Sequence, residues 1–208
     1  MAEEIGLIGP IGDWVLRRAC EQVQLWNHAR VGPPLRVSVN LSSRQFGQHN
    51  LVQMVESALR ESGLPAQCLE LELTESGILL DERAAVPAIR ELHDLGVRLS
   101  VDDFGMGYSS LSRLCDLPLD GLKIDRSFVQ RMHRPRDAAL VATIVTMARS
   151  MRMTAIAEGV ETMDQLLALR QLDCDEMQGF YFSCPLAVGR VRGLLGGAAP
   201  RPARVDQS

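Results

Sequence analysis

The chain has 208 residues, of which 46% are apolar and 23% are charged, so it has the composition of a globular protein with one sizeable core. These values exclude a disordered or fibrous chain, and the net charge of −4 excludes a basic surface for long nucleic acids. No run of about 18 apolar residues occurs, and the first residues lack the pattern of a signal peptide. We therefore expect a cytoplasmic protein without a membrane span.

The cysteine pattern supports a reducing environment. The five cysteines are widely scattered, odd in number and never spaced as Cys-x-x-Cys, which fits neither a disulfide framework nor a structural zinc site. We expect all of them to be reduced residues of the core: Cys20, Cys68, Cys115, Cys174 and Cys184.

The predicted elements begin with a helix and continue as an alternation of strands and helices. A Gly-Pro-Ile-Gly turn precedes a predicted helix over Asp13–His28, with Asp13 placed to cap it. After residue 34, short leucine-rich or β-branched runs alternate with segments of helical period, which is typical of parallel βα units. The predicted strands are Leu35–Leu41, Leu69–Thr74, Val97–Asp102, Gly121–Asp125, Thr154–Glu158 and Glu176–Phe180. The predicted helices between them include Leu51–Ser62, Glu82–Leu95 and Arg136–Met151.

This order of elements predicts an α/β fold. Six βα-type units fit either an open doubly wound sheet or a (β/α) barrel, and an eight-stranded barrel usually needs about 250 residues. Because the chain opens with a helix that has no strand before it, a barrel would lack all or part of its first βα unit. We predict one domain over residues 1–197, followed by a flexible tail over 198–208.

Polar residues occur at the carboxyl ends of all six predicted strands, where buried parallel strands are otherwise apolar. Taken one at a time, each has an ordinary alternative, such as capping the next helix or, for Lys123, pairing with Asp125. Taken together, their oxygen atoms are the ligands that Mg²⁺, Mn²⁺ or Ca²⁺ prefers, and two adjacent aspartates can serve two ions. The residues are Asn40, Glu72, Asp102 with Asp103, Lys123, Glu158 and Gln178.

A segment with two glycines follows the paired aspartates. By itself it is weak evidence, because a tight turn into a helix needs the same residues. Directly after two acids, the segment Asp103–Ser110 is interpreted as a gating loop. Alternation along the strand places Glu72 on the inner face, and Glu75 falls just past the strand, in the following loop.

Six motifs in this order and approximate spacing resemble the EAL-domain phosphodiesterases of cyclic di-GMP. The motifs are Asn40-Leu41-Ser42, Glu72-Leu73-Thr74-Glu75, Asp102-Asp103-Phe104-Gly105, Lys123-Ile124-Asp125, Ala157-Glu158-Gly159-Val160-Glu161 and Gln178-Gly179-Phe180. The resemblance implies a modified TIM barrel that hydrolyses one phosphodiester bond of cyclic di-GMP to give linear pGpG. It also implies two Mg²⁺ or Mn²⁺ ions as cofactors.

The resemblance assigns roles to particular residues. The implied metal ligands are Asn40, Glu72, Asp102, Asp103 and Glu158. Lys123 would hold the attacking water or the scissile phosphate, Glu158 would complete the catalytic site, and Gln178 and Asp125 would contact the substrate. Glu75 would anchor the loop over Asp103–Ser110, and Glu161 would support it through a salt bridge.

The sequence departs from the family at its start. The family's Glu-Ala-Leu segment, with its metal-binding Glu and a phosphate-binding Arg shortly after, has no counterpart in these residues. We therefore expect a modified TIM barrel without its first βα unit and an impaired phosphodiesterase. The alternative is a degenerate EAL domain that binds cyclic di-GMP or a protein without turnover. A generic metal-dependent hydrolase on a barrel is a third reading, which the six motifs argue against.

The resemblance also implies partners. Domains of this family often dimerise through the region after the Asp-Asp-Phe-Gly loop, so a homodimer is expected. Fused sensor or GGDEF domains are common in such proteins, and we expect partners of that kind.

Overall fold

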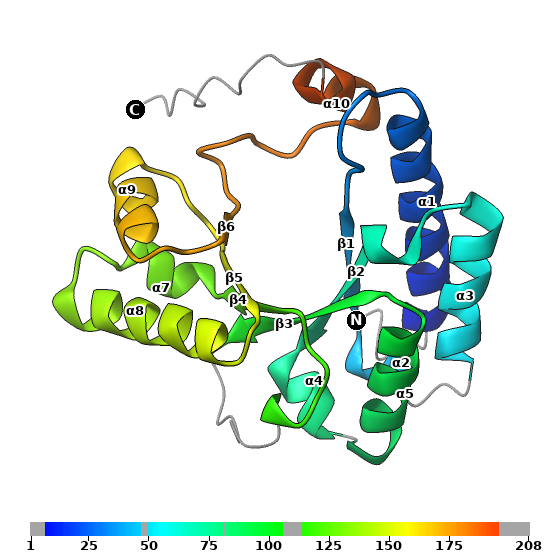
Figure 1. The fold of residues 1–208 in the computed structure, drawn as a ribbon, viewed down its shortest axis with the longest axis horizontal. Coiled ribbons are helices and arrows are strands. Elements are labelled where there is room, and N and C mark those ends of the chain that lie inside the picture. Colours follow the sequence, from blue (N-terminus) through cyan, green and yellow to red (C-terminus); the bar gives the residue numbers. More distant parts are fainter. Residues whose placement is uncertain (1–6, 47–49, 81, 106–113, 196–208) are drawn as a thin grey trace. The chain divides into compact units, whose positions relative to one another are not determined.

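The structure, a computed structural model, describes residues 7–46, 50–80, 82–105 and 114–195. The chain divides into two compact units, Met1–Gly121 and Leu122–Ser208. Strands and helices alternate in both units, which is the arrangement of the predicted α/β class (Figure 1). The predicted single domain over 1–197 stays a prediction, and the predicted tail over 198–208 lies outside the described residues.

The first unit is built on three parallel strands with β2 in the middle. These strands are β1 (Val37–Leu41), β2 (Leu69–Thr74) and β3 (Arg98–Phe104), and the bounds of β2 are those predicted. Pairing places Val39, Leu71 and Leu99 side by side on one face, and all three are buried. Because successive side chains of a strand point to opposite faces, Glu70 and Glu72 lie on the other face.

The helices of the first unit cover these strands. α1 and α3 lie next to each other, α1 contacts β1, and α5 contacts β3 (Figure 1). The predicted helix over Leu51–Ser62 is confirmed at both ends, and Gly63 ends it with the left-handed φ of 69° that favours glycine. The helices are α1 (Ile8–His28), α2 (Ser43–Phe46), α3 (Leu51–Ser62), the short 3₁₀ turn Ala66–Cys68, α4 (Glu75–Leu80) and α5 (Glu82–Asp94).

The predicted start of the first helix is wrong. α1 begins at Ile8, with Leu7 at its N-cap, and runs through the segment expected to be a turn. Pro10 is compatible with this because it falls in the first turn, where a missing N–H removes no helical hydrogen bond. Asp13 therefore does not cap the helix; its Oδ1 accepts a hydrogen bond from Arg17 Nε at 2.9 Å. Within residues 7–46, no strand precedes α1.

The second unit contains three shorter strands, in the order β4 (Gly121–Ile124), β5 (Thr154–Ala157) and β6 (Glu176–Met177), with β5 and β6 parallel. β6 ends three residues before the predicted bound, because the following residues leave the ladder at Gly179. Two side chains cap helices: Asp125 accepts from Ser127 N, and Thr162 accepts from Gln165 N. The helices are α7 (Arg126–Gln130), α8 (Pro135–Ser150), α9 (Met163–Gln171) and α10 (Val188–Leu195).

The cysteines divide into two classes. Cys20, Cys68 and Cys174 are buried as expected, and burial raises the pKa of Cys20 and of Cys174 to about 11. The expectation of burial is wrong for Cys115 and Cys184, which are exposed. All five thiols are free of disulfides. Among the described helices, none combines the length and the apolar composition needed to cross a membrane.

Candidate active site

The polar face of the first unit brings two of the predicted ligands together. The register of the strands pairs Asn40 of β1 with Glu72 of β2, and Glu72 with Ser100 of β3. Residues paired across parallel strands point to the same face, so the amide of Asn40 and the carboxylate of Glu72 are neighbours. Asn40 is exposed, whereas Glu72 is only 7% exposed. These side chains form a row at the carboxyl half of the strands.

The adjacent residues Asp102 and Asp103 lie near the carboxyl end of β3. Thr74 of β2 pairs with Asp102 of β3, one step beyond the row of Asn40 and Glu72. Asp103 has a left-handed φ of 54°, which an aspartate tolerates better than most side chains, and its N–H donates to Asp102 Oδ1 at 3.0 Å. This conformation interrupts the simple alternation of the strand at the residue where the gating loop is expected to begin. Of the predicted loop over Asp103–Ser110, Asp103 and Phe104 still belong to β3, and residues 106–110, including Met106, lie outside the described residues.

Glu75 lies in a helix and not in a loop, which corrects the expectation from the sequence. It is the first residue of α4, and Thr74 Oγ1 accepts a hydrogen bond from Gly77 N at 3.2 Å in the manner of an N-cap. A carboxylate is favoured in a first helical turn because the helix dipole is positive there. Glu75 is 3% exposed, and its Oε2 has no hydrogen-bond partner among the described residues.

Three predicted residues of the second unit meet at one carboxylate. Lys123 Nζ lies 2.6 Å from Glu158 Oε1, and Gln178 Nε2 donates to the same oxygen at 2.6 Å. Lys123 comes from β4, Glu158 follows β5, and Gln178 follows β6. The lysine is 3% exposed, and the carboxylate of Glu158 stabilises its buried charge. The alternative pairing of Lys123 with Asp125 is not observed, since Asp125 caps α7 instead.

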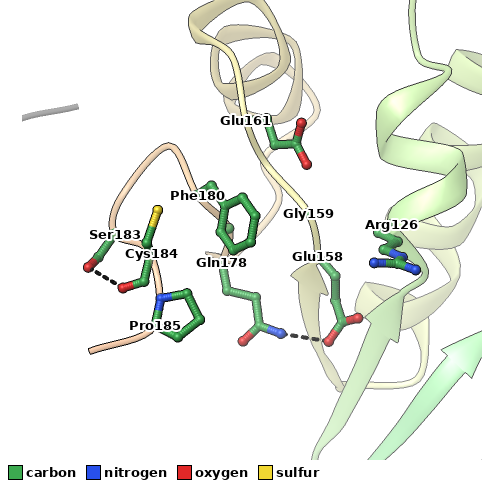
Figure 2. A pocket seen from close by; sticks show the side chains of 10 residues that line it. Arg126, Glu158, Gly159, Glu161, Gln178, Phe180, Ser183, Cys184 and Pro185 are labelled. Carbon is green, nitrogen blue, oxygen red and sulfur yellow. Dashed lines mark hydrogen bonds between the residues drawn. The ribbon is translucent and has the colours of Figure 1, made fainter. Parts of the chain in front are cut away.

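A pocket of about 410 Å³ opens beside this cluster. Figure 2 shows Gln178 and Glu158 pointing toward each other, with Arg126 on the far side of Glu158 and the ring of Phe180 next to Gln178. Cys184 and Pro185 lie on the other side of Gln178. Arg126 and Cys184 carry no signal in the sequence, because their partners in the pocket lie far away in the chain, whereas Phe180 ends the motif Gln178-Gly179-Phe180. The pocket therefore combines one cation and two carboxylates with an amide and an aromatic ring.

Glu161 lies at the edge of the same pocket. Its Oε1 accepts a hydrogen bond from Gln130 Nε2 at 3.3 Å, and the residue is exposed. The predicted supporting salt bridge of Glu161 stays a prediction.

Comparison with known proteins identifies the family. A family model described as the EAL domain matches residues 1–185. The chain belongs to the EAL domain family. A solved structure described as the PaMucR phosphodiesterase in complex with c-di-GMP is 41% identical, with a TM-score of 0.87 over 91% of this chain and 77% of that one. The EAL domain of Mycobacterium smegmatis DcpA is 36% identical, with a TM-score of 0.86 over 94% of this chain and 88% of that one. The predicted fold class, an α/β fold of the TIM-barrel type, is thereby confirmed.

Curated EAL relatives are much longer than this chain. The cyclic di-GMP phosphodiesterase NbdA of Pseudomonas aeruginosa is 43% identical over 199 residues, which are 94% of this chain and 25% of NbdA. The bifunctional diguanylate cyclase/cyclic di-GMP phosphodiesterase MucR of the same organism is 43% identical over 190 residues, 27% of its length. The chain thus spans about a quarter of these relatives.

The residues of the EAL chain fit a hard divalent cation. Asn40 and Glu72 are adjacent by register, and Asp102 follows one step along the same face, so amide and carboxylate oxygens gather without a nitrogen or sulfur ligand. This donor set favours Mg²⁺ or Mn²⁺ over zinc.

Proposed function

We propose that this EAL domain is a phosphodiesterase that hydrolyses cyclic di-GMP to linear pGpG with two Mg²⁺ or Mn²⁺ ions. The observation that carries the proposal is the row of Asn40 and Glu72 with Asp102 beside it, in a family whose relatives are described as cyclic di-GMP phosphodiesterases. Oxygen ligands at the carboxyl ends of parallel strands are where α/β enzymes of this type carry their chemistry.

The proposed metal ligands are those that the family resemblance implies: Asn40, Glu72, Asp102, Asp103 and Glu158. Bound divalent ions would supply an activated water at neutral pH and would stabilise negative charge on the phosphate. The proposal is supported by the oxygen donors on adjacent strands of the first unit and by the carboxylate held at the end of β5.

Lys123 and Gln178 act through their contacts with Glu158 in this proposal. The ammonium group gives a fixed positive potential for the attacking water or the scissile phosphate, and it holds the carboxylate oxygen at 2.6 Å. Gln178 orients the same oxygen and contacts water or substrate. Asp125 is the proposed second contact to substrate, and Glu75 and Glu161 are the proposed supports of the loop over Asp103–Ser110.

A binding module is the second candidate, because the 208 residues contain no counterpart of the Glu-Ala-Leu segment. Loss of one carboxylate ligand and a nearby arginine affects the transition state more than the bound substrate. We therefore propose that the 208-residue chain still binds cyclic di-GMP but hydrolyses it slowly or not detectably.

The test compares this chain with one that carries a family-like first βα unit at its N-terminus. With excess Mn²⁺, pGpG is followed against time, and cyclic di-GMP binding is measured by calorimetry with Ca²⁺ in place of Mn²⁺. We expect binding by both chains and rapid product formation only by the extended one, with Asp102→Asn in the extended chain as the inactive control. Binding without turnover by both chains would assign the binding module, and rapid turnover by the short chain would refute its impairment. Absence of both binding and turnover in both chains would overturn the proposal.

Glu72 and Glu75 should differ in what they control. Glu72→Ala is expected to weaken Mn²⁺ binding about 10-fold or more, because a carboxylate ligand is lost. Glu75→Ala should leave Mn²⁺ affinity within about 3-fold while turnover falls about 100-fold, because a displaced loop misplaces the reacting groups by about 1 Å. Calorimetric Mn²⁺ titration and pGpG formation by the extended chain separate the two effects. Glu70→Gln, two residues earlier on the same face of β2, is the matched control for both.

Equal loss of Mn²⁺ affinity in the Glu72 and Glu75 variants would show that the metal ligand has been misassigned. Both carboxylates are buried, so circular dichroism must first establish that each variant is folded.

We further propose a cytoplasmic location and regulation by partner domains. Free thiols at all five cysteines are consistent with a reducing compartment. Relatives such as MucR are several times longer than this chain, which supports sensor or GGDEF partners, and a homodimer is the proposed oligomer.

A further inference from the structure

A second and larger cavity lies in the second unit, between α7 and α8. Its volume is about 660 Å³, within the range of about 300–1,000 Å³ that small-molecule sites occupy. Three arginines and one aspartate line it, so the charged groups of the lining sum to +2 in a chain whose net charge is −4. These four residues are Arg131, Arg134, Arg136 and Asp137, and apolar atoms of Phe128 and Leu140 form part of the wall.

Arg131 is held in place by its neighbours. Its Nε lies 3.5 Å from Asp137 Oδ1, and its guanidinium lies over the ring of Phe128, 5.7 Å from the centroid. Asp137 therefore compensates the charge of Arg131. The other two arginines are exposed, and among the described residues neither side chain makes a hydrogen bond or an ion pair.

The connection that presents these arginines is short and hydrogen-bonded. Arg131 N donates to Phe128 O at 3.2 Å, Arg134 N donates to Arg131 O at 2.8 Å, and Ala138 N donates to Arg134 O at 3.0 Å. Pro135 then fixes the first turn of α8. A backbone held in this way does not have to be ordered when a ligand binds, so only the arginine side chains lose conformational freedom.

We propose that this cavity binds a diphosphate group, either free or as part of a nucleoside diphosphate. The guanidinium groups of Arg134 and Arg136 each carry several N–H donors in one plane. These donors can pair with the several oxygen atoms of a diphosphate. A diphosphate can balance the charge of +2 that the lining carries, whereas a single carboxylate would balance only half of it. The site is separate from the pocket beside Glu158, and the inference does not depend on the proposed phosphodiesterase activity.

The test uses calorimetric titration with pyrophosphate and with GDP, in EDTA so that no metal ion bridges the ligand. The variant carries Arg134→Ala with Arg136→Ala, and the control carries Arg170→Ala with Arg190→Ala, which removes the same charge from exposed positions elsewhere in the unit. We expect the cavity variant to bind both probes at least 10-fold more weakly than the unmodified chain, and the control to bind within 2-fold of it. Tighter binding of GDP than of pyrophosphate assigns a nucleotide, and equal binding assigns the diphosphate alone; both support the site.

Equal binding by the cavity variant and the control would overturn the proposal. So would binding of a hexaglutamate peptide that depends on Arg134 and Arg136 while pyrophosphate shows none, because the surface would then receive an acidic protein segment.

Discussion

Replacement of Lys123 by Met is expected to lower the rate of pGpG formation by the extended EAL chain by about 100- to 1,000-fold, the usual cost of removing one group that stabilises transition-state charge. The lysine is buried and lies 2.6 Å from Glu158 Oε1, so the substitution removes both a positive potential and the partner that fixes the carboxylate. Methionine keeps the length and apolar body of the side chain, which limits the loss of packing. Product formation at saturating cyclic di-GMP is the measurement.

Stability separates this chemical role from a structural one. Breaking a buried ion pair costs about 3–5 kcal/mol, and we expect the lower end because Gln178 still donates to Glu158. Adding Glu158→Gln to Lys123→Met removes the carboxylate that has lost its lysine, so the double variant should regain most of the lost stability in urea unfolding without regaining activity. Recovery of turnover in the double variant, or an initial loss below 10-fold after correction for the folded fraction, would contradict the assigned role.

Gly179→Ala should be the second strongly damaging substitution. Gly179 has φ 155°, and a Cβ atom there would overlap the backbone N and O of Val160. The same stretch of backbone is joined by hydrogen bonds from Val160 N to Gln178 O and from Tyr181 N to Val160 O. Alanine must push these segments apart, at a cost of about 1–3 kcal/mol, and must move Gln178 away from Glu158. A shift of about 1 Å at this position lowers turnover about 100-fold.

Gly189→Ala provides the matched control. Nothing lies within 4 Å of a Cβ atom at Gly189, which is in α10, so alanine there should be neutral or stabilise the protein by up to about 1 kcal/mol. Urea unfolding and pGpG formation are measured for both variants. Similar behaviour of the two variants would show that the close approach of Gly179 to Val160 does not control the site.

The sequence predicts the elements well where local rules agree. β2 has the predicted bounds because its leucines and glutamates alternate without interruption, and α3 ends as predicted because Gly63 supplies a left-handed cap. The predicted start of α1 is five residues too late, because the segment Gly9-Pro10-Ile11-Gly12 is typical of a turn. The first turn of a helix also tolerates proline, and the structure has a helix there. Local patterns therefore identify an element more reliably than they place its ends.

Contacts between elements are less accessible from the sequence. Alternation and the carboxyl-end rule indicated that Asn40 and Glu72 share a region, and the register confirms that they are neighbours. The partner of Lys123 could not be chosen in this way, since Asp125 is nearer in the chain but Glu158 is nearer in space. Arg126 and Cys184 could not be predicted for the same reason: they belong to a pocket that is assembled by three separate segments.

The two faces of β2 separate the residues that pack the strand from a proposed metal ligand. Leu69, Leu71 and Leu73 supply the packing of the strand, whereas Glu72 occupies the opposite face and leaves no void among the leucines when it is replaced. Replacement of Glu72 would therefore remove a proposed metal ligand without opening a void among the leucines. In a strand of this kind, one substitution on the polar face would abolish catalysis while the fold is retained.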